Sequence, residues 1–299
     1  MKIIFSRKGF DSGCGGVASP IFPNGQILSM PIPGGRSPRR FREIQTPVGN
    51  MGPLAFNLTQ HPGYPAAAAH LDPDLDYLSL PRKEGWKGSL GQAGCAQSHL
   101  QSQGVGVGDL FLFFGWFRHV ESSEKGYQYQ KSSPQQHLLF GYLQIGQVLH
   151  FGAQPDAEAI LAKDPWLYDH PHIENRRSTN NTVYVGAEEL ILPNGPTGLP
   201  GFGAFDHIQD HLILTAPGLS KSKWKLPACF GSEQGSTLTY HKDPKRWETQ
   251  PDGSVILSSV AKGQEFVMEM PEEQNAWDWL NTIVSSPLRG SVLPSKRVI

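Results

Sequence analysis

The feature that most limits how this chain can fold is an apolar segment at residues 110–117, with the sequence LFLFFGWF. Its side chains are apolar at odd and even positions alike, which is typical of a strand in the protein core. It is far shorter than the roughly 18 apolar residues needed to cross a bilayer, and no other segment reaches that length. We therefore expect a core strand in a protein that does not enter a membrane.

The content of glycine and proline favours many short strands and turns over long helices, with 33 Gly and 25 Pro in the chain. Further strands are expected at residues 2–5, 137–151, 181–186, 212–215, 236–241, 254–257 and 264–270, with a hairpin turn at Asn24-Gly25. Helices are expected at residues 91–103, 156–162 and 272–284. Together these elements predict an α+β fold, with a strongly bent mixed sheet or partial β-barrel, a few helices and long loops.

Length and cysteine usage place further limits on the protein. We expect residues 1–299 to form one compact unit, in which residues 175–285 make a β-rich second half with a C-terminal helix. The three cysteines, Cys14, Cys95 and Cys229, are widely separated and form no CxxC motif, so free thiols in a reducing compartment are expected. Because the N-terminal apolar stretch is too short for a signal peptide, we expect a cytoplasmic location.

The formal net charge of −1 argues against a protein whose main work is to coat a nucleic-acid backbone. A locally basic groove remains open, since Arg36, Arg39, Arg40 and Arg42 lie close together within residues 33–65. That segment is rich in Pro, Gly and Arg, and we expect it to be a long surface loop.

The first candidate site is the glycine-rich loop at residues 6–16, which directly follows the expected strand at residues 2–5. Its glycines allow a close backbone approach to a ligand, and successive N–H groups can bind an anion. Two cations would then hold phosphate, while a carboxylate and a hydroxyl act on the sugar or base. The candidate residues are Arg7, Lys8, Asp11, Ser12, Gly15 and Gly16. The loop does not match a P-loop, and a plain glycine-rich bend with two solvated cations is the alternative.

A second candidate is the segment His70-Leu71-Asp72-Pro73-Asp74. Two carboxylates flanking a proline can divide acid and base roles or bind a cation. Asp-Pro-Asp is also a common turn, in which each Asp bonds local backbone, and we favour that interpretation slightly. His70 and Asp72 remain candidate catalytic residues.

A third candidate lies on the expected helix at residues 91–103, where Gln92, Cys95 and His99 would share a face. A Cys–His pair suits nucleophilic catalysis, although helix packing with a hydrogen-bonded His is the commoner outcome. Gln92 and His99 are candidates for substrate binding.

Two weaker groups complete the set. His170, His172, His207 and His211 would bind a metal ion only if residues 207 and 211 lay one helical turn apart, and we expect no metal site. Trp116 and Arg118, at the end of the apolar strand, can stack on a base and contact it. A position in the core is the alternative for Trp116.

The motifs SRKGFDSGCGG, AHLDPDL, GQAGCAQSHL, GVGDLFLFFGWFR and HLLFGYLQIG resemble the third nucleotide modification associated domain. The later motifs SKWKLP, LTYH, RW and GQEF resemble it too, so the resemblance covers nearly the whole chain. That family is linked to DNA-modification systems of bacteria and phages, which implies DNA or a nucleotide, and other proteins of a modification operon, as partners. Residues 1–155 also resemble the PUA-like barrels of ASCH and EVE domains, which commonly hold nucleic-acid bases.

The resemblance and the candidate residues together predict an enzyme that acts on a nucleobase or nucleotide of DNA. Its site is expected where the loop at residues 6–16 meets His70, Asp72, Gln92 and Trp116. The first alternative is a non-catalytic reader that binds modified bases, with the arginine cluster positioning the DNA. A further alternative is a partner protein of a modification operon whose glycine-rich loop is purely structural. The sequence identifies no cofactor.

Overall fold

A mixed sheet of nine strands forms the centre of the protein, in a computed structural model that describes residues 1–35, 37–152, 157–174, 178–232, 234–261 and 263–290. The main path of the sheet is β18 (Glu265–Glu269), β1 (Lys2–Arg7), β8 (Leu110–Ser123), β10 (Gln136–His150), β11 (Thr182–Gly186) and β7 (Ser89–Gln92). Three more strands pair beside this path: β2 (Ser19–Ile21) and β9 (Gly126–Tyr129) with β8, and β14 (Phe202–Ala204) with β10. The sheet is not closed, so the predicted α+β class is confirmed.

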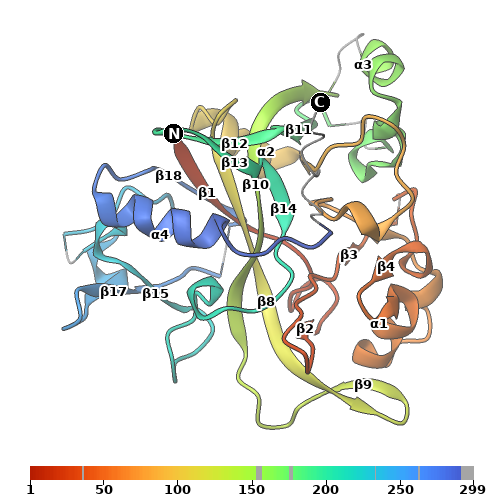
Figure 1. Cartoon of the computed structure of the whole chain (residues 1–299), viewed down its shortest axis with the longest axis horizontal. Helices are drawn as coiled ribbons and strands as arrows, with labels where there is room; N and C mark the ends of the chain where they lie inside the picture. The colour runs from red at the N-terminus through yellow and green to blue at the C-terminus, as the bar shows by residue number, and fades with distance from the viewer. Residues whose placement is uncertain (36, 153–156, 175–177, 233, 262, 291–299) are drawn as a thin grey trace, which may run out of the picture.

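The apolar segment at residues 110–117 is the core strand that its sequence predicts. Within β8, residues 110–115 and Phe117 are buried, whereas Trp116 keeps some exposure. The strand pairs in parallel with β1 and antiparallel with β10, and Figure 1 shows these strands running through the middle of the molecule. A register shift between Leu139 and Gly141 interrupts the long β8–β10 pairing. Such a bulge bends a strand and increases its twist.

Smaller sheets and helices surround the central sheet. The small sheets are β12 (Glu189–Leu192) with β13 (Gly195–Pro200), β15 (Lys223–Pro227) with β17 (Ser254–Ser258) and β16 (Trp247–Thr249), β3 (Ile32–Pro33) with β6 (Ala69–His70), and β4 (Gln45–Thr46) with β5 (Gly49–Asn50). The α-helices of the described part are α1 (Met51–Thr59), α2 (Gly94–Ser102), α3 (Ala157–Lys163) and α4 (Gln274–Val284). In Figure 1, α4 lies with β15 and β17 at the left, and α1 lies with β3 and β4 at the right. None of these helices is long and apolar enough to cross a membrane.

Three hydrophobic clusters hold these parts together. The largest extends from Ile3 to Val284 and covers the central sheet. A second surrounds α1 and includes Ala69, and a third surrounds α3 and includes Ile173. The segments next to Ala69 and Ile173 carry the polar residues described below, so the candidate site lies where the clusters meet.

Several predicted elements differ in the structure. Residues 212–215 and 236–241 are not strands: Leu212 ends a short 3-10 helix, and residues 236–241 are bends and turns. At Asn24-Gly25 the predicted turn forms, with the Gly25 N–H bonded to the carbonyl of Phe22. The chain after the turn does not form a strand, because it pairs with the chain before it through a single isolated bridge between Ile21 and Ile27. The predicted helix at residues 91–103 begins only at Gly94, because the residues before it belong to β7.

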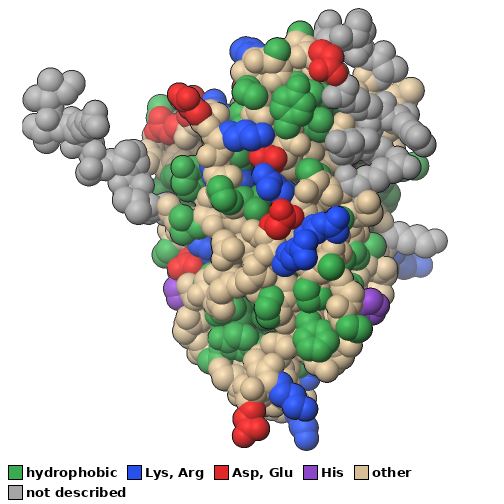
Figure 2. Space-filling view, turned by 90° about the vertical axis from the view of Figure 1, so that its right-hand side faces the viewer, with side chains coloured by type: hydrophobic (Ala, Val, Ile, Leu, Met, Phe, Trp, Pro, Cys, Tyr) green, Lys and Arg blue, Asp and Glu red, His purple; other side chains and the backbone are tan. Residues whose placement is uncertain are grey.

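Of the clustered arginines, Arg36 is outside the described residues, and Arg39 lies close to two carboxylates. Arg39 pairs with Asp169 at 2.9 Å and approaches Glu43 at 3.9 Å, and Arg40 donates to the carbonyl of Ala66. Figure 2 shows one face of the molecule, on which Lys and Arg side chains lie among Asp and Glu side chains. These charges do not form one continuous basic surface on that face.

Candidate functional site

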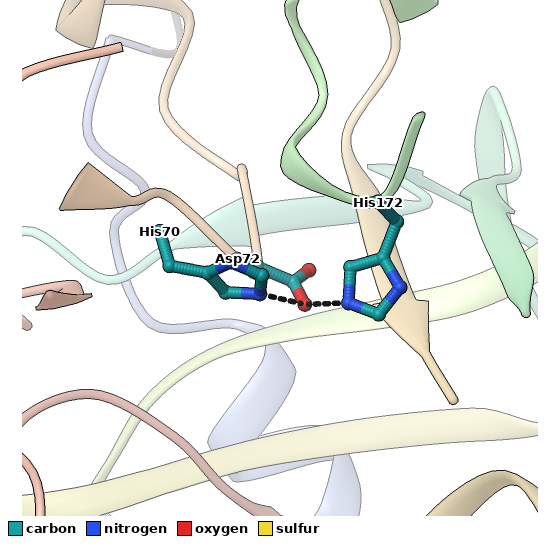
Figure 3. A group of neighbouring side chains, drawn as sticks. All are labelled: His70, Asp72 and His172. Atoms are coloured by element: carbon teal, nitrogen blue, oxygen red, sulfur yellow. Dashed lines mark ion pairs between the residues drawn. The ribbon is translucent and has the colours of Figure 1, made fainter. Parts of the chain in front are cut away.

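Asp72 faces two histidines (Figure 3). His70 is its near neighbour in the sequence, whereas His172 comes from a distant segment. His70 ends β6 and Asp72 follows it, whereas His172 lies in the short 3-10 helix Pro171–Glu174. Oδ2 of Asp72 lies 3.6 Å from Nε2 of His70 and 3.4 Å from Nε2 of His172. We call these three residues the His–Asp–His group.

Backbone geometry positions the carboxylate of Asp72. Its Oδ1 accepts the backbone N–H of Gly91 at 2.8 Å, which leaves Oδ2 directed at the two imidazoles. A Cβ at position 91 would lie 2.2 Å from Cδ2 of His172, so glycine is needed for the close approach of β7 to that ring.

The group is buried at one side and open at the other. Asp72 and His172 have side chains that are 4% and 8% exposed, whereas that of His70 is 26% exposed. Burial by itself would raise the pKa of Asp72, but its polar contacts with His172 and His70 and the charges of His172 and His170 hold it well below its usual range. Burial also disfavours a charged His172, yet Asp72 and Asn181 outweigh this and raise its pKa.

Asn181 and His170 fix the orientation of His172. The amide Nδ2 of Asn181 donates to the carbonyl of His172 at 2.8 Å, so its Oδ1 faces Nδ1 of the ring at 2.7 Å. Nδ1 therefore carries a proton, because an amide oxygen only accepts. His170 accepts the backbone N–H of His172 on Nδ1 at 3.2 Å, and burial lowers the pKa of His170 to about 3. Its Nε2 is buried without a hydrogen bond, 3.8 Å from Oδ1 of Asp72.

A buried ion pair adjoins this group. Lys8 binds Oε1 of Glu265 at 2.9 Å, and Nε2 of Gln92 donates to the same oxygen. The charge of Lys8 also acts on His172, and Gln92 follows Gly91 in β7. Gln92 therefore lies next to the backbone N–H that binds Asp72, and Lys8 lies near enough to His172 to act on its charge. The other oxygen of Glu265 is buried without a hydrogen bond.

The rest of the glycine-rich loop is bonded within the protein. Arg7 donates to the carbonyls of Val260 and Ala261, at 2.7 and 2.6 Å. Oδ1 of Asp11 accepts the N–H groups of Gly13 and Cys14, each at 2.7 Å. The roles predicted for Arg7 and Lys8 in binding phosphate, and for Asp11 in catalysis, therefore stay predictions, and these contacts explain the residues without a ligand.

The glycines and the hydroxyl of this loop are also accounted for locally. A Cβ on Gly15 would lie 2.3 Å from the ring of Phe10, and both Gly15 and Gly16 have positive φ angles. Ser12 is exposed. The backbone approach to a ligand that we predicted for Gly15 and Gly16 stays a prediction.

The remaining predicted residues, Trp116, Arg118 and His99, make their contacts with residues outside the His–Asp–His group. Nζ of Lys221 lies 3.9 Å from the centre of the Trp116 ring, so a base would have to displace it to stack there. Arg118 donates to the carbonyls of Gln130 and Lys131. His99 contacts Thr239 at 3.2 Å and the ring of Tyr240.

One prediction about side-chain proximity is wrong. Gln92, Cys95 and His99 do not share a helix face, because Gln92 ends strand β7 and α2 begins only at Gly94. His207 and His211 are not one helical turn apart in a regular helix. His207 pairs with Asp206 at 3.0 Å, and His211 contacts Ser286 at 2.7 Å.

Sequence reasoning treated His172 apart from Asp72 and did not include Glu265. No local pattern connects either residue with its partners, since 100 residues separate Asp72 from His172 and the Lys8–Glu265 contact spans 257. The available signal was chemical: one short segment places His170 and His172 on either side of Pro171, and the other carries His70 and Asp72 before Pro73.

Comparison with known proteins gives one match. Residues 2–269 match the family described as nucleotide modification associated domain 3. No curated protein and no solved structure matches the chain, so the resemblance of residues 1–155 to PUA-like barrels has no support.

Proposed function

Because this chain belongs to the nucleotide modification associated domain 3 family, we propose that it is an enzyme that modifies a base or nucleotide of DNA. The observation that carries the proposal is the buried carboxylate of Asp72, which faces His70 and His172 without a close hydrogen bond to either. Buried titratable groups whose pKa values are shifted cluster at functional sites, and Asp72 and His172 are groups of this kind.

The partly exposed ring of His70 gives a substrate access to the group. A base that reaches His70 would contact an imidazole whose far side is held by Asp72, and Gly91 and Asn181 fix the groups behind it. Preorganised polar groups of this kind can polarise a base or move a proton at it. An extruded or free base would present its polar edge to the exposed part of His70.

A non-catalytic reader of modified bases is the alternative. It needs cations that are free to contact phosphate, and Arg39 and Arg40 are bonded to protein acceptors instead. The enzyme hypothesis therefore has the better support.

The test is mass spectrometry of nucleosides from DNA and RNA of cells with and without the protein, in its native gene context. We expect a new or missing nucleoside with the wild-type chain and no change with Asp72→Asn. Asp11→Asn is the matched control, since an amide oxygen can still accept the two N–H groups of the loop. Loss with Asp11→Asn alone would place the chemistry in the glycine-rich loop. Unchanged nucleosides with the wild-type chain would favour the reader.

A further inference from the structure

We propose that the His–Asp–His group binds a divalent transition-metal ion such as Zn²⁺ or Fe²⁺ through Nε2 of His70, Oδ2 of Asp72 and Nε2 of His172. This goes against our expectation from sequence, which was that the protein has no metal site. The ion's part in catalysis rests on the proposed function, whereas its binding can be tested without it.

The spacing of the three atoms supports a shared ion. Ligands about 2.1 Å from a tetrahedral metal ion lie about 3.4 Å from one another. The distances from Oδ2 of Asp72 to the two Nε2 atoms are 3.4 and 3.6 Å, and all three atoms lie within 4.8 Å of each other. Direct hydrogen bonds would be shorter, at about 2.7–3.2 Å.

The hydrogen bond between His172 and Asn181 is the second observation. Since Nδ1 of His172 donates to Asn181, a neutral ring presents the lone pair of Nε2 to Oδ2 of Asp72. A lone pair and a carboxylate oxygen repel one another, so a cation must lie between them: either the proton of a charged ring, which would favour an N···O distance of about 2.7–3.2 Å rather than the 3.4 Å found, or a metal ion. Ligating histidines usually donate their other ring N–H to a protein acceptor in this way, which fixes the tautomer.

The carboxylate has a comparable partner behind it. Oδ1 of Asp72 accepts the Gly91 N–H, so only Oδ2 is presented to the ion. His170, buried and without a hydrogen bond on Nε2, approaches Oδ1 at 3.8 Å from the same side. Asp72 and His172 are thus held in place by Gly91 and Asn181, which lie outside the set of ligands.

The donor set indicates the class of ion. Two imidazoles and one carboxylate are a common protein ligand set for Zn²⁺ in hydrolytic sites and for non-haem Fe²⁺. Three protein ligands leave at least one position for water or a substrate atom. That position would face solvent beside His70, the most exposed of the three residues. With one carboxylate, the bound ion keeps a net positive charge, which suits an oxygen of a base or phosphate.

The experiment uses the full chain, stripped with a chelator and titrated with Zn²⁺ by calorimetry and with Co²⁺ by visible absorption. Fe²⁺ is titrated without oxygen. We expect binding of about one ion per chain, a raised melting temperature with Zn²⁺, and Co²⁺ bands of a site with nitrogen and oxygen ligands. His70→Gln should weaken binding by more than 100-fold, beyond the roughly 10–100-fold loss expected for the outer variant Asn181→Leu.

His207→Gln is the matched control, because His207 also faces a carboxylate, that of Asp206 at 3.0 Å, on a half-exposed side chain. It should bind the ion as the wild-type chain does. If His70→Gln does not fold, His172→Gln replaces it, and circular dichroism establishes folding for each variant. Absence of binding by the wild-type chain, or binding by the His70 or His172 variant as tight as that of the wild-type chain, overturns the proposal.

The outcomes separate this proposal from the proposed function. Ion binding that depends on His70, without any change in nucleosides, keeps the metal site and removes the enzyme. A nucleoside change by a chain that binds no ion keeps the enzyme and removes the metal site.

Discussion

The ammonium group of Lys8 lies 2.9 Å from Oε1 of Glu265 in a place where neither side chain has much contact with water. The two side chains are 9% and 1% exposed. Lys8 follows β1 and Glu265 begins β18, so this contact joins the two strands at the edge of the candidate site.

We expect Lys8→Met to lower the free energy of unfolding by about 3–5 kcal/mol, because it leaves a buried carboxylate without its cation. Urea denaturation measures the loss. The double variant Lys8→Met/Glu265→Met should recover much of it, since no charge then remains buried. Lys225→Met is the control: its ion pair with Asp252 at 2.6 Å is exposed and screened by water, so its loss should change the unfolding free energy far less. Equal losses from both single variants would contradict this.

Gly91→Ala tests how closely β7 must approach His172. The added Cβ would meet the ring at 2.2 Å, so we expect a loss of about 1–3 kcal/mol in unfolding free energy and a displaced imidazole. Nucleoside modification, or Co²⁺ binding, should fall with it. Gly106→Ala is the control, because nothing lies within 4 Å of a Cβ there. A Gly91→Ala chain with normal stability and an unchanged Co²⁺ spectrum would show that the ring can move without cost.

Stability should fall in mild acid. Burial lowers the pKa of His137 to about 3 and that of His241 to about 4, and neighbouring cations contribute at both. The unfolded chain takes up these protons near pH 6.5, whereas the folded protein does so only at much lower pH. Each histidine therefore lowers the unfolding free energy by about 1.4 kcal/mol per pH unit below about pH 6.5, and has no such effect above it.

The variant His137→Gln isolates one of these contributions. Nδ1 of His137 accepts the indole N–H of Trp224 at 3.0 Å, and a glutamine oxygen can accept it instead. Urea denaturation between pH 7 and 5 should give a slope that is shallower by about 1.4 kcal/mol per pH unit. If the dependence of unfolding free energy on pH were unchanged in this variant, His137 would not be a neutral buried imidazole in the folded protein.

Thiol reactivity should differ among the cysteines. Burial, with a smaller effect of Glu273, raises the pKa of Cys229 to about 11, and its side chain is partly buried. The thiolate is the reactive form, so Cys229 should be alkylated by iodoacetamide more slowly than the exposed Cys95 at pH 8. Peptide mass spectrometry over time measures both rates. Faster modification of Cys229 would indicate that this region opens.

Sequence patterns predicted the main strands because the signal for a buried strand, a short run of apolar residues, lies within the strand itself. The segments of β1, β8 and β10 are apolar over a strand's length, and burial in the central sheet is the physical reason. The pairing of β1 with β8 is not encoded in either segment alone, since many strands have apolar faces. The wrong strand at residues 236–241 shows the limit of this reasoning. There Thr239 bonds Val267 through its backbone, but the segment does not continue along β18.

The candidate site was predictable in part. His70, Asp72, Lys8 and Gln92 were singled out by their chemistry, and each lies in or beside the group described here. The partnership of Asp72 with His172 depends on how β7 and the segment after α3 pack, which no short pattern records. Asp11 was singled out for the same chemical reason, and its role stays a prediction. In the structure its half-buried carboxylate accepts two N–H groups of its own loop, which no short sequence pattern records.

The position of β1 between β8 and β18 has a consequence for synthesis on the ribosome. The Lys8–Glu265 contact spans 257 residues, so β1 leaves the ribosome long before β18 exists to pair with it. Contacts this distant in sequence form slowly, and an unpaired apolar strand is prone to aggregate in the meantime. A nascent chain that stops before residue 265 would expose one edge of β1. We expect a chaperone that recognises extended apolar segments to bind the nascent chain at this stage.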